Sequence, residues 1–166
     1  ERPLGFEFLF KRRGMSERMF RRSRQPTLPI GEASLDRNYE LHAAFPDAAQ
    51  RLFSDDVVRH LKLLSERWPS IVINDNAVQV HISSPPAKTQ TVMALVNMMV
   101  ELAHAIDHQR ASLPAPEPLA AWVAPWKTVA EARNIDLEEN IPAISGSIAS
   151  RRVLVIPRTG SDGDLH

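Results

Sequence analysis

The chain has no cysteine among its 166 residues. This absence excludes disulfide frameworks, thiolate metal sites and cysteine nucleophiles. Long apolar runs are also missing, because Asn97, Glu101 and His104 interrupt the most hydrophobic stretch, so no membrane-spanning helix is predicted. No signal-peptide pattern and no phosphate-binding glycine loop occur. A chain of this length buries roughly 70% of its unfolded surface, which is enough to stabilise a compact domain without disulfides or bound metals.

Net charge is absent too, but the zero balance hides an asymmetry. Residues 1–24 hold eight Lys/Arg against three Glu, a balance of +5, and the remaining residues have a balance of −5. Most of the positive charge lies in one basic segment, residues 11–24, with seven basic residues and one acid. We define its basic side chains as Lys11, Arg12, Arg13, Arg18, Arg21, Arg22 and Arg24.

The stretch from Ser54 to His108 carries the clearest structural signals. Ser54 is a typical N-cap residue for a helix that Pro69 ends, with an apolar face at Val57, Val58, Leu61, Leu64 and Trp68. Residues 71–82 alternate apolar and polar around Asn74-Asp75-Asn76, whose side chains tolerate positive φ, and this predicts a tight hairpin. Residues 89–108 then predict a long helix across the sheet. Its expected buried seam is Val92, Leu95, Met99, Leu102 and Ile106, widened by Val96, Val100 and Ala103.

Two further strands are expected before this stretch. Residues 4–11 alternate with three phenylalanines on one face, and residues 35–45 alternate around Tyr39, Leu41 and Ala43. Residues 25–34 are expected to form a loop, and a short helix is expected over 48–53. The predicted fold class is therefore α+β, with an antiparallel sheet of two hairpins plus the Phe-rich strand and with helices covering one face.

The C-terminal part offers two alternatives. Residues 1–113 are predicted as the main domain and residues 114–118 as a proline-rich spacer. Beyond the spacer, Pro125 is expected at the first position of a helix that ends near Asn134. A second hairpin is expected over 143–156, turning at about 149–152, before a frayed tail at 161–166. Residues 119–166 either complete the first sheet or begin a second domain, and completion is favoured because a lone hairpin is marginal in water.

The order of these features resembles a family of bacterial domains of unknown function. The resemblance rests on Leu35-Asp36-Arg37 before a strand, on Asp47 after it, on Leu52-Phe53, on the Ser54 helix start, and on the hairpin at 71–82. It covers about residues 35–107. It implies an antiparallel sheet with helices on one side, in a protein whose soluble part lies beside a membrane anchor. It implies no catalytic residue.

Two groups of side chains are candidates for function. The basic segment could bind an acidic protein partner or anionic lipid, could bind nucleic acid, or could be a solvated connection; aromatic residues near it are too few for base stacking. Glu101, His104 and His108 share one face of the long helix at a spacing that can hold zinc. The same three residues also make an ordinary polar stripe, which we favour, because Ala105 occupies the position of the catalytic Glu in zinc hydrolases.

The sequence thus predicts a non-catalytic interaction or scaffolding domain of a bacterial, membrane-associated protein or larger assembly. Its expected partners are another protein, a second copy of the chain or an anionic membrane surface, with nucleic acid disfavoured, and no cofactor or catalytic residue is predicted. The expected location is the cytoplasm or the cytoplasmic face of a membrane. The first alternative is a metal-dependent hydrolase using His104 and His108, and the second is nucleic-acid binding through residues 11–24.

Overall fold

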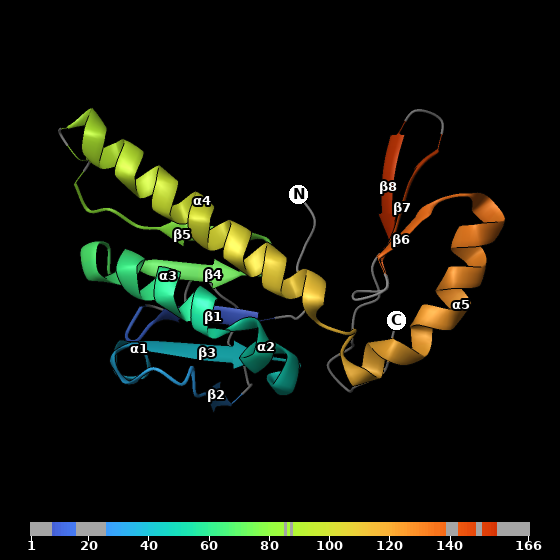
Figure 1. The fold of residues 1–166 in the computed structure, drawn as a ribbon, viewed down its shortest axis with the longest axis horizontal. Coiled ribbons are helices and arrows are strands. Elements are labelled where there is room, and N and C mark those ends of the chain that lie inside the picture. Colours follow the sequence, from blue (N-terminus) through green and yellow to red (C-terminus); the bar gives the residue numbers. More distant parts are fainter. Residues whose placement is uncertain are drawn as a thin grey trace. The chain divides into compact units, whose positions relative to one another are not determined.

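The computed structural model describes residues 8–15, 26–84, 86, 88–138, 143–148 and 151–155 (Figure 1). The chain divides into two compact units, Glu1–Ser112 and Leu113–His166. The first unit contains a five-stranded antiparallel sheet with helices, which confirms the predicted α+β class. None of the helices in the described ranges is long and apolar enough to cross a membrane.

The sheet of the first unit is built around its central strand. The strand order is β2-β3-β1-β4-β5, with bounds Thr27–Leu28 for β2, Tyr39–Ala43 for β3, Phe8–Arg12 for β1, Ile71–Asn74 for β4 and Ala77–Val80 for β5. Phe10 of β1 lies opposite Leu41 on one side and Ile73 on the other, and all three are fully buried. The alternating pattern read from the sequence therefore does place one face of β1 in the core.

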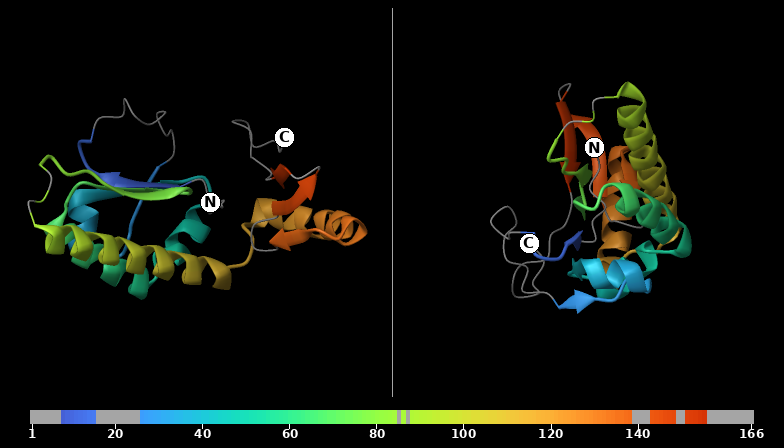
Figure 2. Two further views of the ribbon diagram at one scale, coloured as in Figure 1. Left: turned by 90° about the horizontal axis from the view of Figure 1, so that it is seen from above. Right: turned by 90° about the vertical axis from the view of Figure 1, so that its left-hand side faces the viewer.

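Four helices lie on one side of this sheet, as the left view of Figure 2 shows. They are α1 (Ala33–Asn38), α2 (Pro46–Leu52), α3 (Asp55–Arg67) and α4 (Thr89–Ser112). Between the two layers, Leu61 of α3 and Leu102 of α4 are fully buried together with Phe10 and Leu41. Phe10 also stacks on Tyr39 with ring centroids 4.9 Å apart. The helices and the sheet thus share one apolar interior.

The helix–hairpin pair at 54–80 forms as predicted, but two of its local details differ. Ser54 occupies the N-cap of α3, yet its side chain makes no capping hydrogen bond. In the hairpin, the turn residues have no positive φ, since Asn134 is the one such non-glycine residue in the described ranges. Instead, Asn74 Oδ1 accepts hydrogen bonds from the backbone N–H groups of Asn76 (2.9 Å) and Ala77 (3.0 Å). A side-chain acceptor therefore closes this turn.

The segment before β3 was predicted wrongly. A loop was expected up to residue 34 and a strand from Leu35, whereas α1 occupies Ala33–Asn38 and the strand begins at Tyr39. Glu32 is the N-cap of α1, and its carboxylate accepts hydrogen bonds from the N–H groups of Ser34 and Leu35. Glu is not among the preferred N-cap residues, so the helix start carries no strong sequence signal.

The second unit has its own small sheet. Helix α5 (Glu117–Arg133) begins within the predicted spacer and contains Pro125 in its interior rather than at its start, which corrects that expectation. It ends at Asn134 in a left-handed conformation, near the predicted position. Strands β6 (Asp136–Glu138), β7 (Ala143–Ile148) and β8 (Arg151–Val155) pair only with one another among the described residues. In the described residues, the hairpin therefore belongs to a three-stranded sheet of the second unit. Residues 149–150 and the expected tail lie outside the described residues.

Candidate interaction surface

Helix α4 has two apolar faces, of which one is buried. The residues that face the core are Leu95, Leu102, Ala105 and Ile106. Four other apolar side chains are between 40% and 55% exposed, and we call them the α4 stripe: Val92, Met93, Val96 and Val100. The sequence placed Val92, Val96 and Val100 in the buried seam, and this was wrong. With about 100° per residue, the members of the α4 stripe share one side of the helix.

Two polar contacts show which sides of α4 face α3 and α2. Glu101 Oε2 lies 3.9 Å from Nδ1 of His60 on α3. Further along, the Gln109 side-chain amide donates a hydrogen bond to the Arg51 carbonyl of α2 (2.9 Å). Val96 and Val100 are rotated about 100–140° from Glu101 around the helix axis. The α4 stripe therefore faces away from α3.

The strand next to α4 is the edge of the sheet. β5 pairs with β4 on one side, and among the described residues no strand pairs with its other side. In Figure 1, α4 crosses over β5 near this edge of the sheet. Val78 and Val80 are half-buried, and Ile82, just beyond the strand, is exposed. The α4 stripe and the β5 edge thus lie on the same side of the unit, with apolar residues on both.

The candidate metal ligands form no three-residue cluster suited to a metal ion among the described residues. His104, His108 and Glu101 all lie on the exposed surface of α4. Across the described ranges, no group of three or more His, Asp or Glu side chains has a geometry that could hold a metal ion. Glu101 instead lies nearest His60, whose Nε2 is 3.8 Å from the carboxylate of Asp56. These groups are arranged as polar contacts at the α3–α4 surface.

The basic segment is described only at its start. Lys11 is buried at 5% exposure, and its ammonium lies 2.8 Å from the Glu40 carboxylate on the neighbouring strand. The Arg13 guanidinium donates two hydrogen bonds to the backbone carbonyl of Asp36. Arg12 is exposed. The other four members, Arg18, Arg21, Arg22 and Arg24, lie outside the described residues. Contact of this segment with an acidic partner or lipid surface therefore stays a prediction.

The carboxylate opposite Lys11 is held in its charged form. Burial alone would raise the pKa of Glu40, but the hydrogen bond and the positive charge of Lys11 outweigh burial, so the pKa is lowered. His42, two residues along the same strand, has Nε2 3.7 Å from the second carboxylate oxygen. Lys11, Glu40 and His42 lie on the sheet face opposite Phe10 and Leu41, because side chains alternate along a strand. Their role here is an ion pair that joins β1 to β3.

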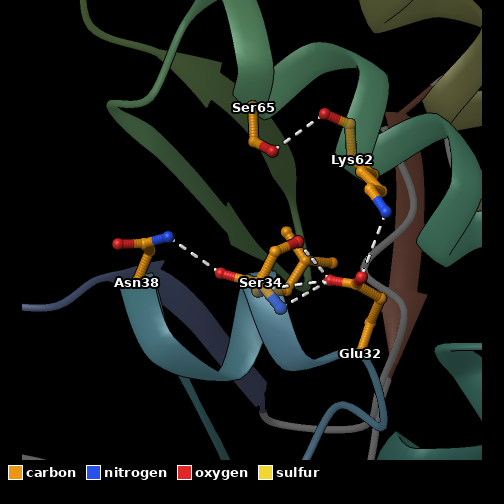
Figure 3. A network of polar contacts seen from close by, with 6 residues as sticks. Glu32, Ser34, Asn38, Lys62 and Ser65 are labelled. Carbon is orange, nitrogen blue, oxygen red and sulfur yellow. Dashed lines mark hydrogen bonds and ion pairs between the residues drawn. The ribbon is translucent and has the colours of Figure 1, made fainter.

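A second polar network joins α1 to α3 (Figure 3). Besides capping α1, the Glu32 carboxylate accepts hydrogen bonds from the Ser34 hydroxyl and from Nζ of Lys62 on α3 (3.1 Å). These bonds, with the Ser34 hydroxyl as the largest contributor, lower the pKa of Glu32 to about 2. Nothing in the local sequence pattern pairs residue 32 with residue 62, so this network could not be predicted from the sequence.

Comparison with known proteins identifies no relative. No protein-family model matches the chain, and neither a curated protein nor a solved structure matches it. The resemblance to a bacterial domain family therefore remains an expectation from the residues alone.

Proposed function

We propose that the chain is a non-catalytic protein-interaction domain that binds its partner through the α4 stripe and the β5 edge. The observation that carries this proposal is the α4 stripe itself, which is four large apolar side chains in water on one side of a well-packed helix. Burying apolar surface stabilises a complex by about 25 cal/mol per Å² before the costs of association. A contiguous exposed apolar strip of this kind is typical of an interaction site.

Three carboxylates of the first unit form ion pairs within the fold. The pKa values of Glu32, Glu40 and Asp56 are all lowered, and each of these groups contacts a cation: Lys62, Lys11 and Arg59 respectively. A carboxyl group that acts as a general acid or base near neutral pH needs a raised pKa. These three are instead held as anions by their ion pairs, so none of them is a candidate general acid or base.

The proposal is tested by site-specific photo-cross-linking in cells that make the whole protein. A photoreactive amino acid at Val96 is expected to give a discrete cross-linked product, because the partner covers the α4 stripe. The matched control places the same amino acid at Gln90, which is exposed on the same helix but about 120° around the axis from Val96. It is expected to give no product. Absence of a product at Val96, or equal products at both positions, would contradict the proposal.

A further inference from the structure

We infer that the occupant of this surface is a second copy of the chain, an inference that rests on the function proposed above. The two copies would be related by a two-fold axis, with β5 pairing antiparallel to β5 of the other copy and the two α4 stripes packing together beside that seam. The five-stranded sheet of each copy would then continue into the other. Three features support this inference: the β5 edge, the α4 stripe, and their position on the same side of the first unit.

β5 has no charged residue, proline or bulge, which are three of the devices that keep edge strands apart. Such strands are protected by lysine, proline or a bulge. β5 reads Ala77-Val78-Gln79-Val80, with no charge and no proline, and its register with β4 is one-to-one from Asn74↔Ala77 to Ile71↔Val80. An uncharged, regular edge is suited to accept another strand.

The hydrogen-bonding pattern sets the register of the pairing. In an antiparallel ladder, residues alternate between those that bond the partner strand and those that point their N–H and C=O outward. The backbone bond from His81 N–H to Ser70 C=O places His81, and hence Gln79 and Ala77, on the β4 side. The backbone groups of Val78 and Val80 therefore point away from β4. A two-fold axis at Gln79 lets Val78 of each copy bond Val80 of the other and sets the two Gln79 residues opposite each other.

The α4 stripe matches this seam in length and in chemistry. From Val92 to Val100 the stripe extends about 12 Å at 1.5 Å per residue, and the four residues of β5 extend about 13 Å. Val78 and Val80 lie opposite Ile73 and Ile71 and so project to the same face as α4. Pairing two copies therefore buries the four valines of the two strands under the two apolar helices.

A second copy fits better than a single helix or a single strand. A lone amphipathic helix would cover the α4 stripe and leave the backbone groups of Val78 and Val80 without protein partners. A lone peptide strand would pair with β5 and leave the stripe in water. A partner that has an apolar helix beside an unpaired edge strand both covers the α4 stripe and bonds the backbone groups of Val78 and Val80. A second copy of this chain has these two features on the same side. Each copy contributes one short strand and one helical stripe to the contact, so weak dimerisation is expected, with a dissociation constant on the order of 10 µM.

The test is sedimentation of the full chain over a concentration series from about 1 to 300 µM, a range that brackets the expected constant. The mass is expected to rise from 18.6 kDa to twice that value. Val96→Glu puts a charge into the apolar contact and is expected to weaken dimerisation at least 30-fold. Gln90→Glu, an exposed position about 120° around the same helix from Val96, is expected to leave it unchanged.

The register is tested by charge reversal at Gln79, which is exposed. Gln79→Lys and Gln79→Glu each place like charges opposite each other across the two-fold axis, so each variant alone is expected to be monomeric at 50 µM. An equimolar mixture of the two is expected to recover the dimer, because it sets lysine against glutamate. The control for folding is the far-UV circular dichroism spectrum. It is expected to be the same for the wild-type chain and for each variant.

Two results would overturn the inference. If the wild-type chain stays at 18.6 kDa throughout, the second copy is not the occupant. In that case a cross-linked product at Val96 would leave the proposed function standing with another protein as partner. If the chain dimerises but neither Val96→Glu nor the Gln79 variants weaken the dimer, the interface lies elsewhere.

Discussion

At the scale of single residues, the half-buried Glu32 links two helices of the first unit. Its carboxylate caps α1 through the N–H groups of Ser34 and Leu35 and also accepts a hydrogen bond from Lys62 of α3. One acid therefore both starts a short helix and ties it to a longer one. A six-residue helix has little stability of its own, so its position depends on such contacts.

This arrangement predicts an acid-sensitive contribution to stability. The pKa of Glu32 falls from 4.5 in a free side chain to about 2 in the fold. A depressed folded-state pKa means that the stabilisation is complete above about pH 4.5 and is lost as the pH falls toward 2. Glu32→Gln should lower the thermal midpoint by a few degrees at pH 7 and should flatten the decline between pH 4.5 and 2. Thermal unfolding at a series of pH values measures both effects.

The matched control is Glu66→Gln, an exposed carboxylate on the same helix as Lys62. It should follow the wild-type pH profile. A Glu32→Gln profile that runs parallel to wild type over the whole acid range would show that the carboxylate does not link α1 to α3 in this way.

Residue-level roles were the hardest part to predict from sequence. Lys11 was assigned to the basic segment because a sequence shows which charges are neighbours along the chain but not which charges pair in the fold. The structure places it opposite Glu40 in the β1–β3 register, with its ammonium buried in an ion pair. That pairing joins residues 29 positions apart, and no local pattern encodes it. The candidate residues on α4 were predicted better, since the polar face of a helix follows from spacing alone.

At the scale of elements, the β4–β5 hairpin depends on the side chain of Asn74. Its Oδ1 accepts two backbone N–H bonds across a two-residue turn. Asn74→Ala removes this acceptor, and losing a hydrogen-bond partner of this kind typically costs about 1–2 kcal/mol. Asn74→Asp keeps an oxygen at the same place and should cost less. Urea unfolding of the three proteins gives the comparison, and equal losses for Ala and Asp would argue against the turn described here.

The elements also show where sequence patterns succeed and where they fail. Pro69 and the alternation at 71–80 predicted α3 and the hairpin because they act locally on backbone geometry. For α4 the pattern correctly predicted the helix and the burial of Leu95, Leu102 and Ile106, but it made the buried seam too wide, since apolar residues surround much of the helix. The polar contacts of Glu101 and Gln109 are consistent with the observed orientation of the helix. Those partners lie on α3 and α2, so the orientation depends on tertiary structure.

At the scale of the whole molecule, each compact unit is organised by itself. The fully buried large side chains, from Phe10 through Leu41, Leu61 and Ile73 to Leu102, belong to the first unit. The second unit has a separate three-stranded sheet. A segment with its own core is expected to fold alone. The favoured prediction that the C-terminal hairpin completes the first sheet would have required strands of both units to pair, and β6, β7 and β8 bond to one another instead.

Residues 1–112 are therefore expected to fold without the rest of the chain. The fragment should unfold cooperatively, with a midpoint within about 2 °C of the corresponding transition of the full chain, because the buried residues that stabilise it are all retained.

A fragment ending at Val100 is the control. It lacks Leu102 and Ile106, which α4 buries against the core, and losing two such side chains costs about 2–5 kcal/mol each. That loss is comparable to the whole stability of a small domain, so the shorter fragment should not fold. Calorimetry at low micromolar concentration, where the inferred dimer is dissociated, separates the stability of the unit from that of its assembly. A fragment 1–112 with no cooperative transition would mean that the first unit is not an independent domain.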